Sequence, residues 1–147
     1  MNKEDIKIKK LENESELNKI MDIWLENNII SHKFIDESYW KNNFNNVKIL
    51  IPKADVYILY KNNNILGFSG VMDNYIAGIF IDKEYQNNGL GSLLINKLKL
   101  NYTSLTLDVY KENINAYNFY IKKEFRVIDE KIDIINNHIE YRMIWNK

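Results

Sequence analysis

The sequence predicts a mixed α/β domain that spans residues 1–147, and three observations carry this prediction. A chain of 147 residues has the size of one domain and can bury about 68–70% of the surface that it exposes when unfolded. Segments with helical spacing of apolar residues alternate with segments that have the pattern of strands. In the C-terminal half these follow the order strand, helix, strand, helix, which is typical of a crossover unit.

The N-terminal half is predicted to hold a strand, two helices and a hairpin. Ile6–Lys9 alternates apolar and charged residues, as a short strand does. Ser15 and Glu16 then open a helix, because apolar residues recur at helical spacing from Leu17 to Leu25. The next predicted elements are a helical region at Phe34–Val47 and a hairpin made of Val56–Tyr60, a polar turn at 61–64 and Ile65–Met72.

The C-terminal half is organised around Tyr75–Ile81, a run that is apolar on both faces. A strand with this pattern is usually central in its sheet, covered above and below, and often parallel to a neighbour. The elements predicted after it are a helix at Gly89–Leu100, a strand at Leu105–Val109, a helix at Ile114–Lys123 and a closing antiparallel hairpin of Phe125–Asp133 and Ile139–Trp145.

Composition excludes several classes of function. Twenty basic and twenty acidic residues cancel, so no electrostatic footprint indicates a nucleic acid or an anionic membrane as partner. The absence of cysteine removes disulfides, thiolate nucleophiles and cysteine-rich zinc sites, and we expect no metal. The polar start and the lack of a long apolar run argue against a signal peptide or membrane span, so we expect a cytoplasmic protein.

A loop of small and polar residues, Asp82–Ser92, connects the central strand to the third helix. A helix start leaves backbone N–H groups without partners and carries the positive end of the helix dipole, so it suits a bound phosphate. Gly89 and Gly91 would allow close approach to the backbone. The same residues also fit a plain turn with two glycines for tight packing. A dinucleotide fingerprint is excluded because Leu94 replaces its third glycine, and no Gly-Lys-Ser/Thr ends a P-loop.

A second group of candidate residues lies on the helix that follows the next strand. Asn113, Ala116, Tyr117 and Tyr120 share one helical face. This face would bring an amide, a small residue and a phenol to the carboxyl edge of the sheet, where crossover folds place ligands. On a lone helix, the aromatic residues also fit a role in the core.

The two segments together resemble the GNAT superfamily of acyl-CoA-dependent N-acetyltransferases. Gln86-Asn87-Asn88-Gly89-Leu90-Gly91 matches the family signature Gln/Arg-x-x-Gly-x-Gly/Ala, and the apolar strand end Ile79-Phe80-Ile81 precedes it. Asn113-x-x-Ala116-x-x-Phe119-Tyr120 matches the second motif of the family. The order of elements agrees across nearly the whole chain, and the stretch from Trp24 to Trp40 looks like that of small bacterial single-domain members.

The resemblance implies a GNAT-like fold with a twisted, mostly antiparallel sheet of roughly six to seven strands and about four helices. The fourth strand would carry a bulge, and the fourth and fifth strands would splay apart to admit acetyl-CoA as cosubstrate. The backbone of Ile79, Phe80 and Ile81 would then pair with pantetheine and polarise the thioester carbonyl, and Asn113 would contact the same arm. The pyrophosphate would rest on the loop and helix start formed by Gln86, Asn87, Asn88, Gly89, Leu90, Gly91 and Ser92.

Two departures from the family pattern carry physical consequences. Asn87 and Asn88 stand where relatives often carry lysine or arginine, so we expect cofactor affinity to rest on amides and the helix dipole, and salt to weaken it only modestly. Glu124 stands where the family usually has glycine just before Phe125. If that position needs a positive φ, a glutamate there is strained.

The resemblance implies direct acetyl transfer to a primary amine, and Tyr120 matches the tyrosine that commonly protonates the departing thiolate. The acceptor is expected to be a small-molecule or peptide amine. His32 and Tyr75 are candidates for the acceptor side, although a lone histidine or tyrosine also fits a structural role. Asp36, Glu37 and Asp73 could attract a cationic acceptor or simply be surface charges, and His138 is expected in a solvated turn.

A second class of function stays open from the sequence. The cofactor motifs specify binding better than turnover, so the chain could be an acyl-CoA-binding regulatory or interaction module. Its oligomeric state is expected to be monomer or homodimer.

Overall fold

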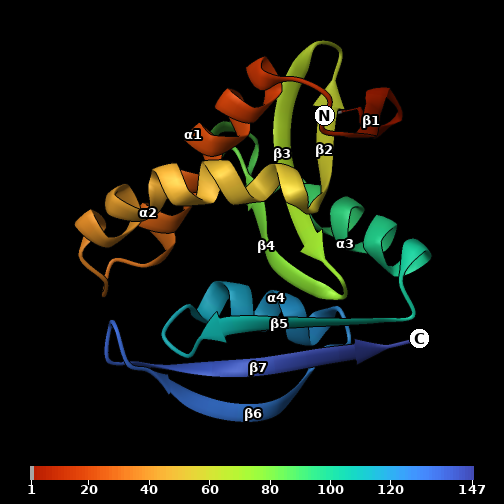
Figure 1. Ribbon diagram of the computed structural model, residues 1–147. Helices are drawn as coiled ribbons and strands as arrows, with labels where there is room; N and C mark the ends of the chain where they lie inside the picture. The colour runs from red at the N-terminus through yellow and green to blue at the C-terminus, as the bar shows by residue number, and fades with distance from the viewer. Residues whose placement is uncertain (1) are drawn as a thin grey trace.

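A seven-stranded sheet runs through the computed structural model, which describes residues 2–147 (Figure 1). The strand order is β1-β2-β3-β4-β5-β7-β6, and within residues 2–147 only β4 and β5 are parallel. The mixed, mostly antiparallel sheet confirms the predicted fold class. The strands are β1 (Ile6–Lys10), β2 (Asp55–Lys61), β3 (Asn64–Met72), β4 (Tyr75–Ile81), β5 (Ser104–Tyr110), β6 (Arg126–Asp133) and β7 (His138–Asn146).

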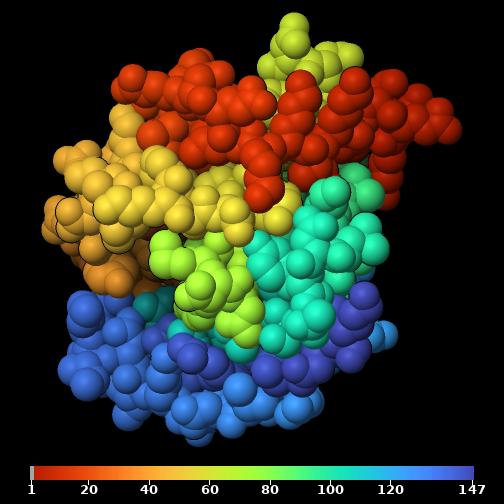
Figure 2. Space-filling view, turned by 45° about the vertical axis from the view of Figure 1, so that its right-hand side comes forward, coloured from red at the N-terminus to blue at the C-terminus, as the bar shows by residue number. Residues whose placement is uncertain are grey.

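Within residues 2–147, four α-helices cover the two faces of this sheet. α1 (Glu14–Ser31) and α2 (Glu37–Leu50) pack on one face, and α3 (Leu90–Asn101) and α4 (Ile114–Lys122) pack on the other. Side chains alternate along a strand, so β2 contributes Ile58 to the core under α1 and Leu59 to the core under α3. Figure 2 shows the two helical segments α1 and α2 in red and yellow on one part of the molecule, with the blue β6–β7 region at its base.

The starts of α1 and α2 are set by side-chain caps. Asn13 and Glu16 form a capping box at α1, in which each side chain binds the other residue's backbone N–H. Asp36 accepts the N–H of Ser38 at 2.8 Å and fixes the start of α2. The helical region predicted from Phe34 therefore begins too early, because the capping carboxylate places the first helical residue at Glu37.

The splay and the bulge expected in the middle of the sheet are both present. β4 and β5 are matched at a single pair, Tyr75 with Thr106. In β4 the register with β3 shifts between Ile76 and Gly78, which leaves Ala77 as the bulged residue. The two strands therefore part soon after their shared start, and the sheet opens between them.

The turn after α4 places a glutamate in a left-handed conformation. Glu124 has φ of 71°, so the strain foreseen for this position is present. The turn closes with two hydrogen bonds of 3.0 Å, from the N–H of Phe125 to the carbonyl of Tyr120 and from that of Glu124 to Ile121. This is the Schellman arrangement, whose left-handed position glycine normally occupies.

Candidate active site

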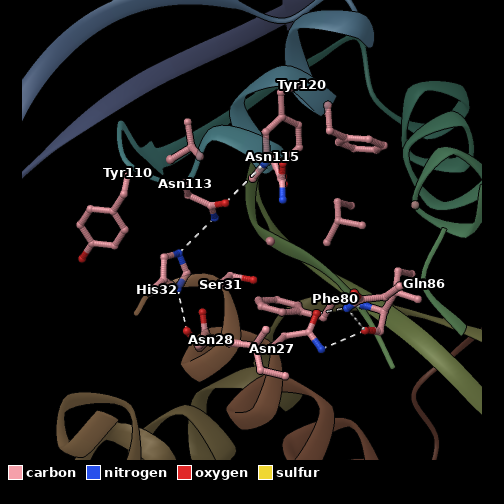
Figure 3. Close-up of a pocket in the computed structure, with 18 of the residues that line it drawn as sticks. Asn27, Asn28, Ser31, His32, Phe80, Gln86, Tyr110, Asn113, Asn115 and Tyr120 are labelled. Atoms are coloured by element: carbon pink, nitrogen blue, oxygen red, sulfur yellow. Dashed lines mark hydrogen bonds between the residues drawn. The ribbon is translucent and has the colours of Figure 1, made fainter. Parts of the chain in front are cut away.

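A cleft of about 1210 Å³ opens where β4 and β5 part. Its walls come from α1, β4, the loop before α3, β5 and α4 (Figure 3). The structure brings almost all of the sequence-predicted site residues to this cleft: Ile79, Phe80, Ile81, Gln86, Asn87, Gly89, Leu90, Gly91, Ser92, Asn113, Tyr120, His32 and Tyr75 all line it. Asn88 does not, because its side-chain amide turns into the loop and donates to the carbonyls of Tyr85 and Gln86.

The open edge of β4 presents its backbone to the cleft. Asn27 of α1 binds both backbone groups of Ile81, with Nδ2 donating to the carbonyl at 2.9 Å and Oδ1 accepting the N–H at 3.2 Å. The carbonyl of Ile81 also accepts from Gln86 Nε2 at 3.0 Å (Figure 3). Because backbone groups alternate in direction along a strand, Ile79 faces the same edge as Ile81. Ile79 is therefore the residue whose backbone groups face the cleft beside the bulge.

Tyr120 reaches this edge from the opposite wall. Its side chain is 6% exposed, and the backbone N–H of Ile79 faces its hydroxyl oxygen. Burial raises the pKa of Tyr120 well above its ordinary value, and the smaller opposing effect of the Ile79 N–H does not cancel it. The phenol has its own O–H to donate. Tyr120 therefore holds a proton at neutral pH beside the edge of β4.

The loop before α3 forms the other end of the cleft. Asn87 and Gly89 both have positive φ, at 66° and 74°, and Gly89 caps the helix without a side-chain hydrogen bond. The first N–H groups of α3 have no intrahelical partner, as at any helix start. At Gly91 a Cβ atom would meet the ring of Phe119 at 3.3 Å, so a larger residue here would require that ring to shift by a few tenths of an ångström. The conformation suits a backbone that binds an anion.

The side-chain ammonium of Lys3, which no sequence motif indicated, lies beside this loop. The Nζ atom of Lys3 is 2.7 Å from the place that a Cβ atom on Gly89 would occupy. Lys3 forms no ion pair with the other residues in the range 2–147. A lysine at the positive end of a helix dipole is unfavourable until an anion binds there. The sequence holds no local signal for this contact, because Lys3 lies far from the loop in the chain.

The end of the cleft beside Tyr75 is built around Asp108. This carboxylate accepts two hydrogen bonds from Arg142 at 2.8 and 2.9 Å, and one from the Tyr75 hydroxyl at 3.1 Å. Burial and the adjacent Asp108 raise the pKa of Tyr75, so Tyr75 holds its proton and is no base at neutral pH. Burial, together with Asp108 and Asp133, also raises the pKa of Glu140, which lines the cleft beside Tyr75 and Asp108.

His32 lies across the cleft from α4 and forms a hydrogen-bonded link to it. Its Nδ1 is 3.0 Å from the carbonyl of Asn28, and its Nε2 is 3.2 Å from Nδ2 of Asn113. The ring stacks on Trp40 at 4.9 Å between centroids. Burial lowers the pKa of His32 to about 4, so the ring is neutral at pH 7.

The other ionisable residues named from the sequence cap a helix, form ion pairs or lie away from the cleft. Asp36 is the N-cap of α2, Glu37 pairs with Lys41 at 2.8 Å, and His138 pairs with Glu112 at 2.6 Å. Asp73 does not line the cleft.

Among residues 2–147 no group of three or more His, Asp or Glu side chains could hold a metal ion. No helix in the described range has the length and apolar character needed to cross a bilayer.

Comparison with known proteins places this fold and cleft in a family. Residues 52–127 match the model of the acetyltransferase (GNAT) domain, a range that holds the bulged strand, the loop before α3 and α4. The chain belongs to the GNAT acetyltransferases, a family of acyl-CoA-dependent N-acetyltransferases.

Two curated relatives share this family. Peptidyl-lysine N-acetyltransferase YiaC of Escherichia coli K12 is 29% identical over 117 residues, which cover 78% of this chain and 80% of the relative. Peptidyl-lysine N-acetyltransferase YjaB of Salmonella typhimurium is 25% identical, over 74% of this chain and 76% of the relative.

Solved structures share the fold. The solution structure of the apo form of YjaB from Escherichia coli superposes with a TM-score of 0.82 at 21% identity, and covers 95% of this chain and 97% of that one. Spermidine N-acetyltransferase from Vibrio cholerae, in complex with CoA and spermine, superposes with a TM-score of 0.70 at 19% identity, over 97% of this chain and 96% of that one.

Proposed function

We propose that this chain transfers an acetyl group from acetyl-CoA directly to a primary amine. The observation that carries the proposal is the position of Tyr120, whose buried hydroxyl lies at the open edge of β4 beside Ile79 and across the cleft from the loop before α3. Acetyl-CoA would supply an activated thioester. The residues present fit it: a free backbone edge at Ile79, and a helix start whose first amides have no intrahelical partner and no side-chain cap.

Ile79 and Tyr120 would have different roles at the reacting group. The backbone of Ile79 would hold and polarise the carbonyl, because an N–H at a dry, fixed edge stabilises negative charge that develops on oxygen. Tyr120 would donate its proton toward the leaving sulfur. A thiol has an ordinary pKa of about 8.5, below that of a phenol, but burial raises the pKa of any group whose deprotonated form is anionic. The cleft therefore disfavours a free thiolate and favours its hydrogen bond to Tyr120.

The acceptor side fits a cationic amine. Tyr75, Tyr110 and Trp40 line it together with the carboxylates of Glu112 and Glu140. Asp108 is already paired with Arg142 and Lys131, and Glu112 with His138, which leaves Glu140 as the carboxylate to face an ammonium. The lysine acceptors in the names of the two curated relatives favour a lysine side chain, and the structural neighbour with spermine makes polyamines the comparison to test.

A thiol-release assay with acetyl-CoA and a panel of amines tests the proposal. We expect release that depends on a lysine-containing peptide, with N-acetyl-lysine in the product by mass spectrometry. Spermidine and the same peptide with arginine in place of lysine are the comparison acceptors. Saturable binding of acetyl-CoA without release by any acceptor would overturn the proposal and support an acyl-CoA-binding module instead.

A further inference from the structure

The hydrogen bond between His32 and Asn113 joins the two sides of the cleft. His32 follows α1, which packs on β4 through Asn27, and Asn113 is the N-cap of α4. The two residues are 81 positions apart in the chain. In Figure 3 this bond crosses from α1 to α4 at the end of the cleft opposite Gln86, and Tyr120 lies further along α4.

The partners fix the direction of each hydrogen bond in this link. The carbonyl of Asn28 can only accept, so Nδ1 of His32 carries the ring proton. Nε2 then has a free lone pair and accepts from Nδ2 of Asn113. The other half of the Asn113 amide is also committed, because Oδ1 accepts the N–H of Ala116 at 3.4 Å as the helix cap. Every group in the chain of bonds is neutral, and the carbonyl of Asn28 also accepts the backbone N–H of His32 at 3.1 Å.

Ring contacts also join the two walls at this end, those of His32 and Phe34 with Tyr110 on β5 and that of Phe34 with His138 on β7, but none of them involves α4. β4 and β5 pair only at Tyr75 and Thr106, at the start of both strands. Beyond that pair, the sheet itself does not hold the strands together. Tyr120 lies two helical turns after Asn113 on the same face of α4, so a shift at the helix start moves its hydroxyl relative to Ile79.

We propose that His32 is a positioning residue that, through Asn113, holds α4 at the distance from β4 at which Tyr120 meets the reacting group. The proposal rests on the proposed acetyltransferase function. It differs from a role for His32 as base or acceptor contact, because the required feature is the lone pair of Nε2 toward Asn113 and not contact with substrate. A small change in this geometry costs turnover far more than binding, since catalysis depends on alignment of the reacting atoms.

Two substitutions of His32 separate these roles. His32→Gln keeps an acceptor oxygen near the place of Nε2, whereas His32→Leu fills similar space with no acceptor. We expect kcat of His32→Leu to fall by about tenfold or more and that of His32→Gln to be several-fold higher than in the Leu variant. The Kd for CoA by calorimetry should change by less than about threefold in both, because the loop before α3 lies at the far end of the cleft. Equal losses in the two variants would overturn the proposal, because a catalytic base or a packing residue would lose the same activity with either substitution.

A readout without turnover keeps the test independent of the proposed function. Asn113→Asp retains the helix cap but turns a carboxylate toward Nε2, which favours a protonated ring. The pKa of His32, followed by NMR, should therefore rise from about 4 toward neutrality in this variant. An unchanged titration would overturn the link itself. Absence of thiol release by the wild-type protein would contradict the acetyltransferase proposal and leave this titration to decide the His32–Asn113 geometry.

Discussion

The backbone N–H of Ile79 on β4 faces the hydroxyl oxygen of Tyr120 on α4. The two residues belong to elements on opposite sides of the splay, since β4 and the β5–α4 unit are matched only at Tyr75 and Thr106. A donor for developing charge on oxygen and a protonated phenol thus meet where the sheet opens. This relationship supports the proposed role of Tyr120 as the proton donor to the leaving sulfur.

Tyr120→Phe is expected to lower kcat by about 10²-fold or more while the Kd for acetyl-CoA stays within about threefold. The hydroxyl is needed as the leaving sulfur acquires charge, whereas the ring packing against Phe119 and Phe125 is retained in phenylalanine. Steady-state kinetics and calorimetry measure the two effects. Tyr117→Phe, on the same helix and packed on Tyr141, is the matched control and should keep its turnover. Wild-type turnover in Tyr120→Phe would remove Tyr120 from the reaction.

Two isosteric substitutions at Gly89 separate the effect of charge at the loop from the effect of side-chain size. Its φ of 74° is one that asparagine and aspartate tolerate better than other residues, so Gly89→Asn and Gly89→Asp should fold alike. Aspartate adds a negative charge where the phosphates of CoA would lie, so its Kd for CoA should exceed that of the asparagine variant by about tenfold at low salt. Calorimetry at two ionic strengths should show the difference shrinking with salt. Equal affinities would mean that the loop does not hold the phosphates.

The parts of the fold with a strong hydrophobic pattern could be predicted from the sequence. β4 is a continuous apolar run, α3 and α4 have clear helical periodicity, and the glycine spacing at 89 and 91 identified the loop between β4 and α3. The contacts that complete the cleft could not be predicted, because they join residues far apart in the chain. Asn27 and Ile81 are 54 positions apart, and His32 and Asn113 are 81 positions apart. Asparagine is abundant in this chain, so no single asparagine stands out until the fold brings it to a backbone edge. Glu140 and Asp108 lie on strands without any motif.

Lys3 changes the salt dependence expected from the sequence. The loop itself carries asparagines, which predicts modest sensitivity to salt, but the ammonium of Lys3 lies beside Gly89. Lys3→Ala should raise the Kd for CoA by about two- to fivefold at low ionic strength, and the loss should shrink toward 0.5 M salt, where the Debye length is only about 4–5 Å. Lys7→Ala on β1 is the exposed control. Repeating the comparison with 3′-dephospho-CoA assigns the contact to one phosphate group. Identical salt curves for Lys3→Ala and the wild type would contradict the prediction.

Acid should destabilise the protein through His32. The ring stays neutral in the folded protein down to a pKa of about 4, whereas the unfolded chain takes up that proton below about 6.5. The unfolded state therefore binds more protons in this window, and stability falls as the pH decreases. From pH 7 to pH 5 the loss from this group is about 2 kcal/mol. Urea unfolding at the two pH values should show a smaller loss in His32→Gln, and an equal loss in both proteins would contradict the burial of a neutral ring.

Glu124 occupies a left-handed position that glycine would adopt without strain. A non-glycine residue there costs roughly 1–2 kcal/mol, and part of the gain from glycine is offset by the greater freedom of the unfolded chain. Glu124→Gly should therefore raise the free energy of unfolding by about 0.5–1 kcal/mol, measured by urea denaturation. Glu124→Gln separates the two properties of the residue, because it removes the charge near Lys99 and keeps the strained backbone. Stabilisation by glycine and not by glutamine would assign the cost to φ. A gain of the same size in both variants would assign it to charge instead.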